Sequence, residues 1–252
     1  TSKKDDEKKG ELQEFLNDIA STSEKLSVSF TEEENAQLSF KLLKDNNETG
    51  ITFRGIPNGH EFTSLLLAVL NTDGQGKNFP DEAIQRRIKS LKGEIALKTY
   101  VSLTCTNCPD VVQALNLMSL INPNIKHEMV DGGIYQQEVS DLNIQGVPAV
   151  YCNNESLHIG RGDLGILLQE LEDMVGSEAL ENEESIEREY DVIVIGGGPA
   201  GASAAIYSAR KGLKVGLVAE RIGGQVNDTT GIQNLISVPN TNGTQLAADL
   251  KA

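Results

Sequence analysis

Two cysteines three positions apart, Cys105 and Cys108, have the spacing most suggestive of chemistry in this chain. They follow an apolar stretch that predicts a strand, and a stretch with helical periodicity comes directly after them. A cysteine at the start of a helix faces unpaired backbone N–H groups, which favour the nucleophilic thiolate. We therefore expect Cys105 to be the exposed nucleophile and Cys108 the thiol that closes a disulfide. Pro109 is tolerated because its missing N–H would have no partner in the first helical turn.

A structural zinc site is the main alternative, because zinc is often held by two such cysteine pairs. The other candidate ligands, Cys152, His127 and His158, come from separate predicted strands and lack the spacing of a pair. The sequence therefore favours a redox dithiol without a metal, while zinc binding and inert cysteines stay open as alternatives. We expect Cys152 to be a small buried strand residue.

Pro148 lies at the start of an apolar stretch, GVPAV, where a strand is predicted and proline is unfavourable. A cis peptide bond at this position would place its backbone against the dithiol. A trans proline on an edge strand is the alternative, because cis is the minority form even before proline.

A second candidate site is the glycine motif GGGPAG, which follows the apolar stretch DVIVIG and precedes a helix rich in small residues. Glycines at these places permit a tight turn and let a pyrophosphate approach the helix N-terminus. An acid at the end of the next strand suits a ribose hydroxyl and disfavours a 2′-phosphate. The predicted cofactor contacts are Gly196, Gly198, Pro199, Ala200, Gly201 and Glu220. A glycine-rich turn that only packs a helix is the alternative.

The elements that must position these sites form two similar α/β patterns. Helices are predicted at 7–22, 59–72, 80–91, 110–121, 134–142 and 162–175, and strands at 25–30, 36–45, 51–56, 94–103, 125–131, 146–152 and 155–160. Arg54-Gly55 and Arg161-Gly162 stand at matching places, each after a strand and before a leucine-rich helix. We interpret the patterns as two copies of one unit, the first without a cysteine pair and without its opening strand.

Composition narrows the possible functions. The 252 residues are 38% hydrophobic, which is enough for one to three globular domains. A net charge of −15 argues against binding to nucleic acid or to anionic lipid. The chain has neither a membrane-length apolar stretch nor a signal-peptide pattern, and its three cysteines fit a reducing compartment. We expect a cytoplasmic protein.

Four segments resemble known flavoenzymes. ERIGGQ (220–225) and IQNLISVP (232–239) resemble flavin-binding segments of the pyridine-nucleotide disulfide reductases, close to thioredoxin reductase. NGHEFTSLLLAVL (58–70) and the segment around the dithiol (104–133) resemble the flavoprotein family of the alkyl hydroperoxide reductases. The resemblance implies an α/β fold with two tandem thioredoxin-like units followed by a partial Rossmann-like FAD-binding βαβ unit.

That resemblance also implies domain boundaries and a pathway. The expected domains are a thioredoxin-like unit without a cysteine pair at 1–92, one with the redox pair at 93–176, an acidic linker at 177–189 and part of an FAD-binding domain at 190–252. In the family, electrons pass from NAD(P)H through FAD and a core dithiol to the N-terminal dithiol. They end on a partner, the peroxiredoxin component of alkyl hydroperoxide reductase, which reduces alkyl hydroperoxides and hydrogen peroxide.

The family pattern assigns roles to further residues. It makes Glu61 the acid beside the dithiol, whereas the sequence alone indicates only a carboxylate favoured at a helix start. The flavin contacts that it implies are Gly224, Gln225 and Asn234. A homodimer is implied for the complete protein.

This chain departs from the family pattern in two respects, because it has no second Gly-x-Gly-x-x-Gly and no second Cys-x-x-Cys. We therefore expect a fragment that is truncated at its N-terminal unit, lacks the NAD(P)H domain and binds FAD poorly. Two other functions stay open. One is a non-catalytic thioredoxin-like module for docking or metal binding, and the other is a general disulfide reductase or isomerase.

Overall fold

The structure is a computed structural model that describes residues 3–31, 38–74, 76, 78–178, 188–219, 221–238 and 240–251. The chain divides into two compact units, residues 1–183 and 184–252. Most of the predicted acidic linker, residues 179–187, lies outside the described residues, and so does Glu220.

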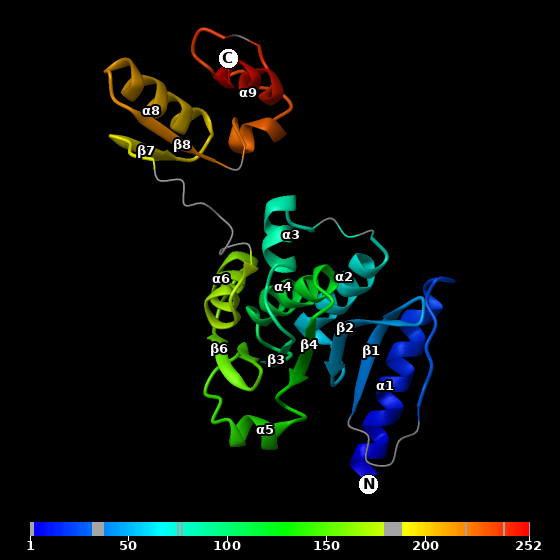
Figure 1. Ribbon diagram of the computed structural model, residues 1–252. Helices are drawn as coiled ribbons and strands as arrows, with labels where there is room; N and C mark the ends of the chain where they lie inside the picture. Colours follow the sequence, from blue (N-terminus) through cyan, green and yellow to red (C-terminus); the bar gives the residue numbers. More distant parts are fainter. Residues whose placement is uncertain are drawn as a thin grey trace. The chain divides into compact units, whose positions relative to one another are not determined.

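The larger unit is built on one six-stranded sheet (Figure 1). Its strands are β1 (Ser39–Lys44), β2 (Asn47–Arg54), β3 (Ile95–Val101), β4 (Ile125–Asp131), β5 (Ala149–Cys152) and β6 (Glu155–Ile159). They lie in the order β1-β2-β4-β3-β5-β6, with β2, β4 and β3 parallel and the other pairs antiparallel. The β1–β2 hairpin of the first predicted repeat therefore continues the sheet of the second through the pairing of β2 with β4.

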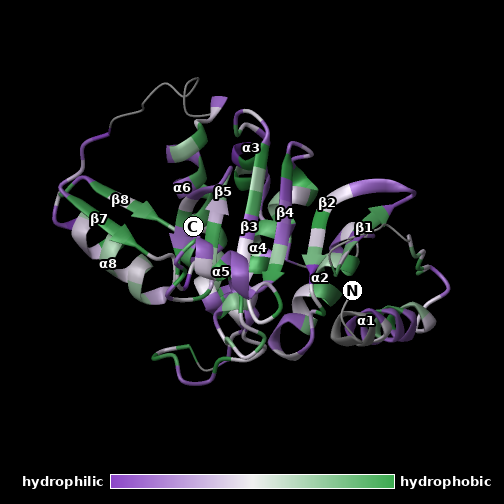
Figure 2. Cartoon of the chain, turned by 90° about the horizontal axis from the view of Figure 1, so that it is seen from below, coloured by the Kyte–Doolittle hydropathy of each residue, from purple (hydrophilic) through white to green (hydrophobic). Residues whose placement is uncertain are grey.

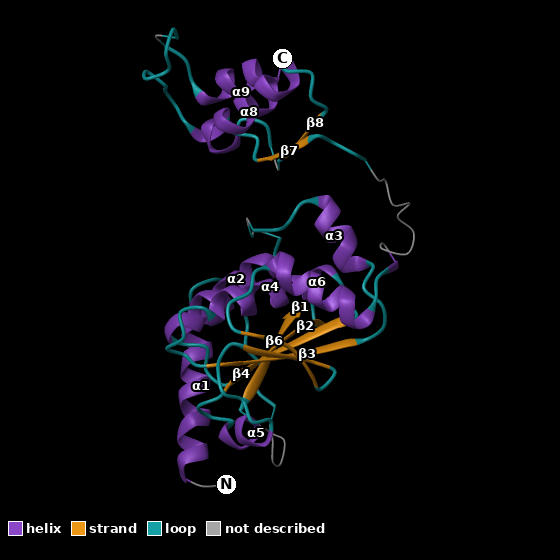
Figure 3. Cartoon of the chain, turned by 90° about the vertical axis from the view of Figure 1, so that its left-hand side faces the viewer, coloured by secondary structure: helices purple, strands orange, loops and turns teal. Residues whose placement is uncertain are grey.

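Helices cover both faces of this sheet (Figure 3). They are α1 (Lys3–Ser21), the short 3-10 helix η1 (Gly59–Glu61), α2 (Phe62–Thr72), α3 (Glu82–Lys89), α4 (Cys108–Ile121), α5 (Gln136–Asp141) and α6 (Leu164–Val175). On one face α4 packs between α2 and α6, and on the other face α5 and its flanking loops cover β3, β4 and β5. Because both faces are covered, β3 and β4 are buried along most of their length.

The central helix α4 anchors the core of the larger unit. Its side chains Val111, Leu115 and Met118 are fully buried, and they belong to the same apolar cluster as Leu167 and Leu171 of α6. Each fully buried side chain of this kind contributes roughly 1.5–3 kcal/mol relative to an exposed one. The start of α4, which carries the cysteine pair, is therefore fixed by the most buried helix of the unit.

One predicted strand is absent. Residues 25–30 are described and form no strand, although Leu26 and Val28 are half-buried and their neighbours exposed, as the alternation indicated. A strand also needs a partner for its backbone hydrogen bonds, and this segment pairs with none of the described strands. The prediction of a strand at 25–30 was wrong because alternation reports burial and not pairing.

Arg54, at the end of β2, joins the two predicted repeats. Its side chain is 4% exposed, donates from Nη1 to Glu138 Oε2 of α5 at 2.9 Å, and lies 4.1 Å from the ring centre of Tyr135. Tyr100 of β3 donates to the same carboxylate at 3.0 Å. The matching Arg161 is exposed and lines a cavity between α4 and the start of α6 instead. The two Arg-Gly pairs have therefore taken different roles.

The smaller unit is a βαβ crossover. Its elements are β7 (Val192–Ile195), α8 (Pro199–Arg210), β8 (Val215–Val218), the 3-10 helix η2 (Gly224–Asp228) and α9 (Gly243–Lys251). Strands β7 and β8 pair in parallel, and α8 packs on one face of the pair. The opposite face carries Ile193, Ile195 and Val218, and Ile195 is 86% exposed. Figure 2 shows both strands as hydrophobic ribbons, so this small sheet has one uncovered apolar face.

Candidate functional site

The cysteine pair lies where β3 leads into α4. Cys105 and Cys108 form a disulfide with their Cα atoms 5.6 Å apart. Cys105 is partly exposed, whereas Cys108 begins α4 and is fully buried. Attack from solvent can therefore reach Cys105 alone, which agrees with the role predicted for it.

Several dipoles surround the Cys105 sulfur. The backbone N–H of Cys108 donates to Cys105 Sγ over 3.2 Å, and no side chain caps the start of α4. A backbone N–H and the positive end of a helix both stabilise a thiolate at this position. Once the disulfide is reduced, we expect Cys105 to have the lower thiol pKa of the pair.

Pro148 borders the same sulfur. The Val147–Pro148 peptide bond is cis, which confirms the prediction, and the Val147 carbonyl oxygen lies 3.8 Å from Cys105 Sγ. The Pro148 carbonyl accepts from the backbone N–H of Gly160 at 2.8 Å. This strand edge is therefore held beside the cysteine that a substrate can reach.

Glu61 is a buried acid at the junction of η1 and α2. Its side chain is fully buried, and burial raises its pKa to about 7, an effect that the nearby Ser64 hydroxyl opposes in part. Neither carboxyl oxygen has a well-placed hydrogen-bond donor among the described residues. An acid with this pKa can take up or release a proton at neutral pH.

The backbone connects Glu61 to the dithiol loop. The N–H of His60 donates to the Leu103 carbonyl at 3.2 Å, two residues before Cys105. Gly59 has a φ of +56°, and a Cβ there would lie 2.7 Å from that carbonyl oxygen. Only glycine permits this close approach, and η1 also packs against α4. The structure thus brings together three of the predicted residues, Cys105, Cys108 and Pro148, and joins the Glu61 segment to their loop.

The other zinc candidates have different surroundings. His127 is fully buried, with Nδ1 2.8 Å from Asn116 Oδ1 and Nε2 2.8 Å from Thr99 Oγ1, and burial lowers its pKa to about 3. His158 Nδ1 lies 3.0 Å from Glu170 Oε2. Cys152 is a buried free thiol whose pKa is raised by burial and by Glu155. The structure places these three side chains on β4, β6 and β5, and none is a partner of the cysteine pair.

The glycine motif forms the turn between β7 and α8. Gly196 has a φ of +116° and donates to the Val218 carbonyl at 2.8 Å. A Cβ at Gly201 would lie 1.8 Å from the Gly196 oxygen, so this position requires glycine. Gly198 precedes α8 without a capping side chain, and Pro199 and Ala200 form its first turn. The first N–H groups of α8 can therefore receive the phosphates of a dinucleotide, so the motif fits FAD.

Only part of the predicted flavin-contact set gathers at this turn. Gly223 donates to the Gly197 carbonyl at 2.7 Å, and a Cβ at Gly224 would lie 3.4 Å from Gly198 Cα. Gln225 follows as an exposed residue of η2. Asn234 is exposed, and none of the hydrogen bonds found among the described residues joins its side chain to the turn.

Comparisons with known proteins relate this chain to flavin-dependent oxidoreductases. Residues 191–243 match the family of FAD dependent oxidoreductases. Over 98% of its length the chain is 48% identical to the F component of alkyl hydroperoxide reductase from Staphylococcus aureus strain Mu50, and equally so to a Bacillus subtilis strain 168 protein named NADH dehydrogenase. The chain spans 47% of the length of each.

The deciding comparison is with a solved structure, the NTD_N/C domain of the alkyl hydroperoxide reductase AhpF from Enterococcus faecalis. It matches with a TM-score of 0.62 and 33% identity, over 66% of this chain and 84% of that one. The chain belongs to the AhpF family of alkyl hydroperoxide reductases. Membership confirms the resemblance seen in the sequence and the expected α/β fold class.

In this AhpF-family chain the two sites lie on separate units, the dithiol at the start of α4 and the glycine turn before α8. Among the described helices none is long and apolar enough to cross a membrane. Sequence reasoning missed one buried acid near the dithiol loop, Asp131 at the end of β4. The signal that could have identified it was its position as the last residue of a predicted strand, at the same edge of the sheet as the strand that leads to Cys105.

Proposed function

We propose that this chain carries the peroxiredoxin-reducing dithiol of an NAD(P)H-dependent, FAD-containing disulfide oxidoreductase in the cytoplasm. The observation that supports this best is the pairing of accessible Cys105 with buried Cys108, beside Pro148 and on the loop to which the Glu61 segment is bonded. The proposed partner is the peroxiredoxin component of alkyl hydroperoxide reductase, and the complete protein is proposed to be a homodimer.

The exchange starts from the reduced pair. The Cys105 thiolate attacks one sulfur of the partner's disulfide, forms an intermolecular disulfide and releases the other partner sulfur as a thiolate, which takes a proton from solvent. Cys108 then loses its proton, with Glu61 as the proposed acceptor, and attacks Cys105 Sγ. The intermolecular bond breaks, the partner leaves with two thiols, and Cys105 and Cys108 are oxidised to the disulfide.

The glycine turn is proposed to hold the pyrophosphate of FAD through Gly198, Ala200 and Gly201, with Gly224 beside it. Bound FAD would supply the route by which electrons from NAD(P)H reach the dithiols of the complete protein. The open face of β7–β8 supports the proposal that residues 190–252 bind FAD poorly by themselves.

Cysteine variants test the function directly. The reduced chain is mixed with the peroxiredoxin in its disulfide form, and free thiols are counted by mass spectrometry. Wild type should reduce the partner, Cys105→Ser should not, and Cys108→Ser should accumulate a covalent complex with it. Cys152→Ala, a change at the buried free thiol, should behave as wild type.

Two outcomes would contradict the proposal. Release of partner thiols by Cys105→Ser would show that another group is the nucleophile. Stoichiometric zinc bound by Cys105 and Cys108 in the purified chain would favour the non-catalytic metal-binding module.

A further inference from the structure

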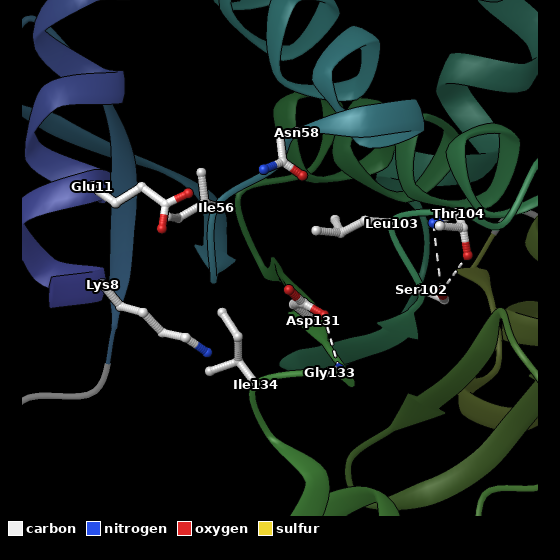
Figure 4. A pocket seen from close by; sticks show the side chains of 10 residues that line it. All are labelled: Lys8, Glu11, Ile56, Asn58, Ser102, Leu103, Thr104, Asp131, Gly133 and Ile134. Carbon is white, nitrogen blue, oxygen red and sulfur yellow. Dashed lines mark hydrogen bonds between the residues drawn. The ribbon is translucent and has the colours of Figure 1, made fainter. Parts of the chain in front are cut away.

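A cavity of about 370 Å³ opens beside the dithiol loop (Figure 4). Its walls come from α1 and from the segments that follow β2, β3 and β4, so it lies at the carboxyl ends of the three parallel strands. In open α/β sheets this edge is the common position for ligands. One wall residue is Thr104, whose chain neighbour is Cys105. The cavity therefore borders the loop that carries the accessible sulfur.

A buried carboxylate lines this cavity. Asp131 is 6% exposed, and its Oδ1 accepts from the backbone N–H of Gly133 at 2.8 Å. Burial is the main reason that its pKa is raised, although the hydrogen bond from Gly133 and, less strongly, the charge of Lys8 oppose the rise. No ion pair with this carboxylate is found among the described residues. A buried charge without an ion-pair partner is unfavourable, so a cation entering the cavity would gain from it.

The neighbouring backbone is adapted to the carboxylate. Gly55 has a φ of +124°, and a Cβ there would lie 2.8 Å from Asp131 Cβ and 3.6 Å from Oδ2. A larger residue at this position would push Asp131 out of place. Gly55, which follows β2, therefore leaves the space that the Asp131 side chain occupies. This explains why a glycine follows Arg54.

We propose that this cavity binds the lysine or arginine side chain of the partner's disulfide-bearing segment, close in sequence to the cysteine that Cys105 attacks. This inference rests on the proposed function. Ile56, Leu103 and Ile134 offer apolar surface to a methylene stem, and Asp131 offers a carboxylate to the cationic head. The net charge of −15 also favours a basic segment over an acidic one.

The arrangement predicts opposite effects for two neighbouring charges. Figure 4 shows the side chains of Lys8 and Glu11 extending from α1 toward the cavity. Lys8 would compete with the incoming cation, whereas Glu11 would assist it. Removing Lys8 should therefore strengthen recognition of a basic segment, and removing Asp131 or Glu11 should weaken it.

The test uses three short peptides, each carrying one cysteine as a mixed disulfide with 5-thio-2-nitrobenzoate. They differ only in having Lys, Gln or Glu two residues before the cysteine. The reduced full chain attacks the peptide sulfur and releases coloured thionitrobenzoate, which gives a second-order rate constant. We expect the order Lys, Gln, Glu, with a Lys-to-Glu ratio of about tenfold at low ionic strength that shrinks with added salt.

Variants assign the preference to the cavity. Asp131→Asn can still accept from Gly133 and should bring the Lys-to-Glu ratio below about twofold, whereas Lys8→Gln should raise the ratio. Asp18→Asn makes the same charge change at an exposed place on α1 outside the cavity lining and should leave the ratio unchanged. If Asp131→Asn fails to fold, Lys8→Gln and Glu11→Gln still test the proposal through their opposite signs.

The possible failures are distinguishable. Equal rates for the three peptides, or a preference that survives Asp131→Asn, would overturn the cavity assignment while the dithiol function stands. The reduced chain is also mixed with the disulfide formed by two 5-thio-2-nitrobenzoate groups, which carries no peptide. If the chain reacts neither with this reagent nor with any of the three peptides, the proposed function is overturned, and the cavity assignment with it.

Discussion

At the scale of single residues, side chains of the same type differ in solvent exposure and in pKa because their surroundings differ. After the disulfide is reduced, Cys105 and Cys152 both carry a thiol. Only Cys105 of these two lies next to a helix start and is accessible to solvent. Burial raises the pKa of Glu61 to about 7, whereas Arg54 lowers the pKa of Glu138 through its hydrogen bond. Position in the fold therefore decides which side chains can exchange electrons or protons at neutral pH.

Glu61→Gln should slow disulfide exchange by the chain. If Glu61 takes the proton of Cys108, the rate should fall on the order of 100-fold, the low end of the range for a general base. The wild-type pH–rate profile should show an inflection near pH 7 that the variant lacks. Stopped-flow kinetics with a small uncharged disulfide would measure both, and Glu82→Gln, at an exposed position on α3, provides the control. An unchanged profile would remove Glu61 from the mechanism.

The same substitution has a predictable effect on stability. The pKa of Glu61 is about 7 in the folded chain against an ordinary 4.5, so the native state holds this proton more tightly than the unfolded state. The stability tied to it is complete below about pH 4.5 and is lost as pH rises through 7, on the order of 3 kcal/mol in total. Glu61→Gln should therefore gain stability over wild type between pH 5 and 8 in urea titrations. A constant difference over this range would contradict the raised pKa.

Gly201→Ala should disrupt the smaller unit alone. A Cβ at this position would lie 1.8 Å from the Gly196 oxygen, so the turn and α8 must move apart. Hydrogen exchange of the backbone amides of 188–251 should accelerate, while those of β3 and α4 stay protected. Gly231→Ala adds the same methyl group where no atom lies within 4 Å and should change little. Equal effects of the two variants would argue against the tight turn.

At the scale of elements, one sheet unites the two predicted repeats. Strand β2 of the β1–β2 hairpin pairs with β4 of the second predicted repeat. The Arg54–Glu138 contact also links the two repeats, because it joins the end of β2 to α5. A buried Arg with a bidentate carboxylate partner and an aromatic face is geometrically specific. We infer that this contact fixes the register of the β1–β2 hairpin relative to the rest of the sheet.

Arg54→Met should lower the free energy of unfolding by about 3 kcal/mol, because it leaves the partly buried Glu138 carboxylate without its cation. The Arg54–Glu138 contribution is present above the ordinary glutamate pKa of 4.5 and is lost as pH falls through the lowered pKa of Glu138. Urea denaturation at pH 7 and at pH 3 would measure both effects. Lys41→Ala, in the exposed pair with Glu48, should cost at most about 1 kcal/mol. An equal loss in the free energy of unfolding for Arg54→Met and Lys41→Ala would contradict the role assigned to Arg54.

At the scale of the whole molecule, the two units differ in how much of their sheets is buried. The larger unit buries its central strands on both faces, whereas β7 and β8 leave Ile193, Ile195 and Val218 uncovered. Parallel sheets are normally covered on both sides. The exposed apolar face of β7 and β8 is therefore the unusual feature of the smaller unit.

The purified chain should therefore carry far less than one FAD per molecule. The glycine turn supplies N–H groups for a pyrophosphate, but Ile193, Ile195 and Val218 on the other face of β7 and β8 stay exposed to solvent. The chain is mixed with FAD and passed through gel filtration, and the flavin absorbance of the protein peak measures the occupancy. The same measurement on Gly201→Ala gives the amount of FAD that is retained without the glycine turn. Stoichiometric, tightly bound FAD would contradict the prediction.

The sequence by itself determined the features that depend on residues close together in the chain. The cysteine pair, the glycines of the β7–α8 turn and the helix at α4 could all be predicted from spacing or periodicity over a few residues. For Pro148 the sequence suggested a cis bond but left the trans form open, and the structure decided between them. The family resemblance then named a role for Glu61.

Only the tertiary structure decided the features that depend on distant contacts. It paired β2 with β4, left 25–30 without a partner among the described strands and buried Asp131 beside the dithiol loop. Strand pairing and burial are set by segments far apart in the sequence, and a local pattern carries no information about which segment will be the neighbour. For the same reason, the pKa of a carboxylate cannot be predicted from its place in the chain, because the shift depends on the groups that fold around it.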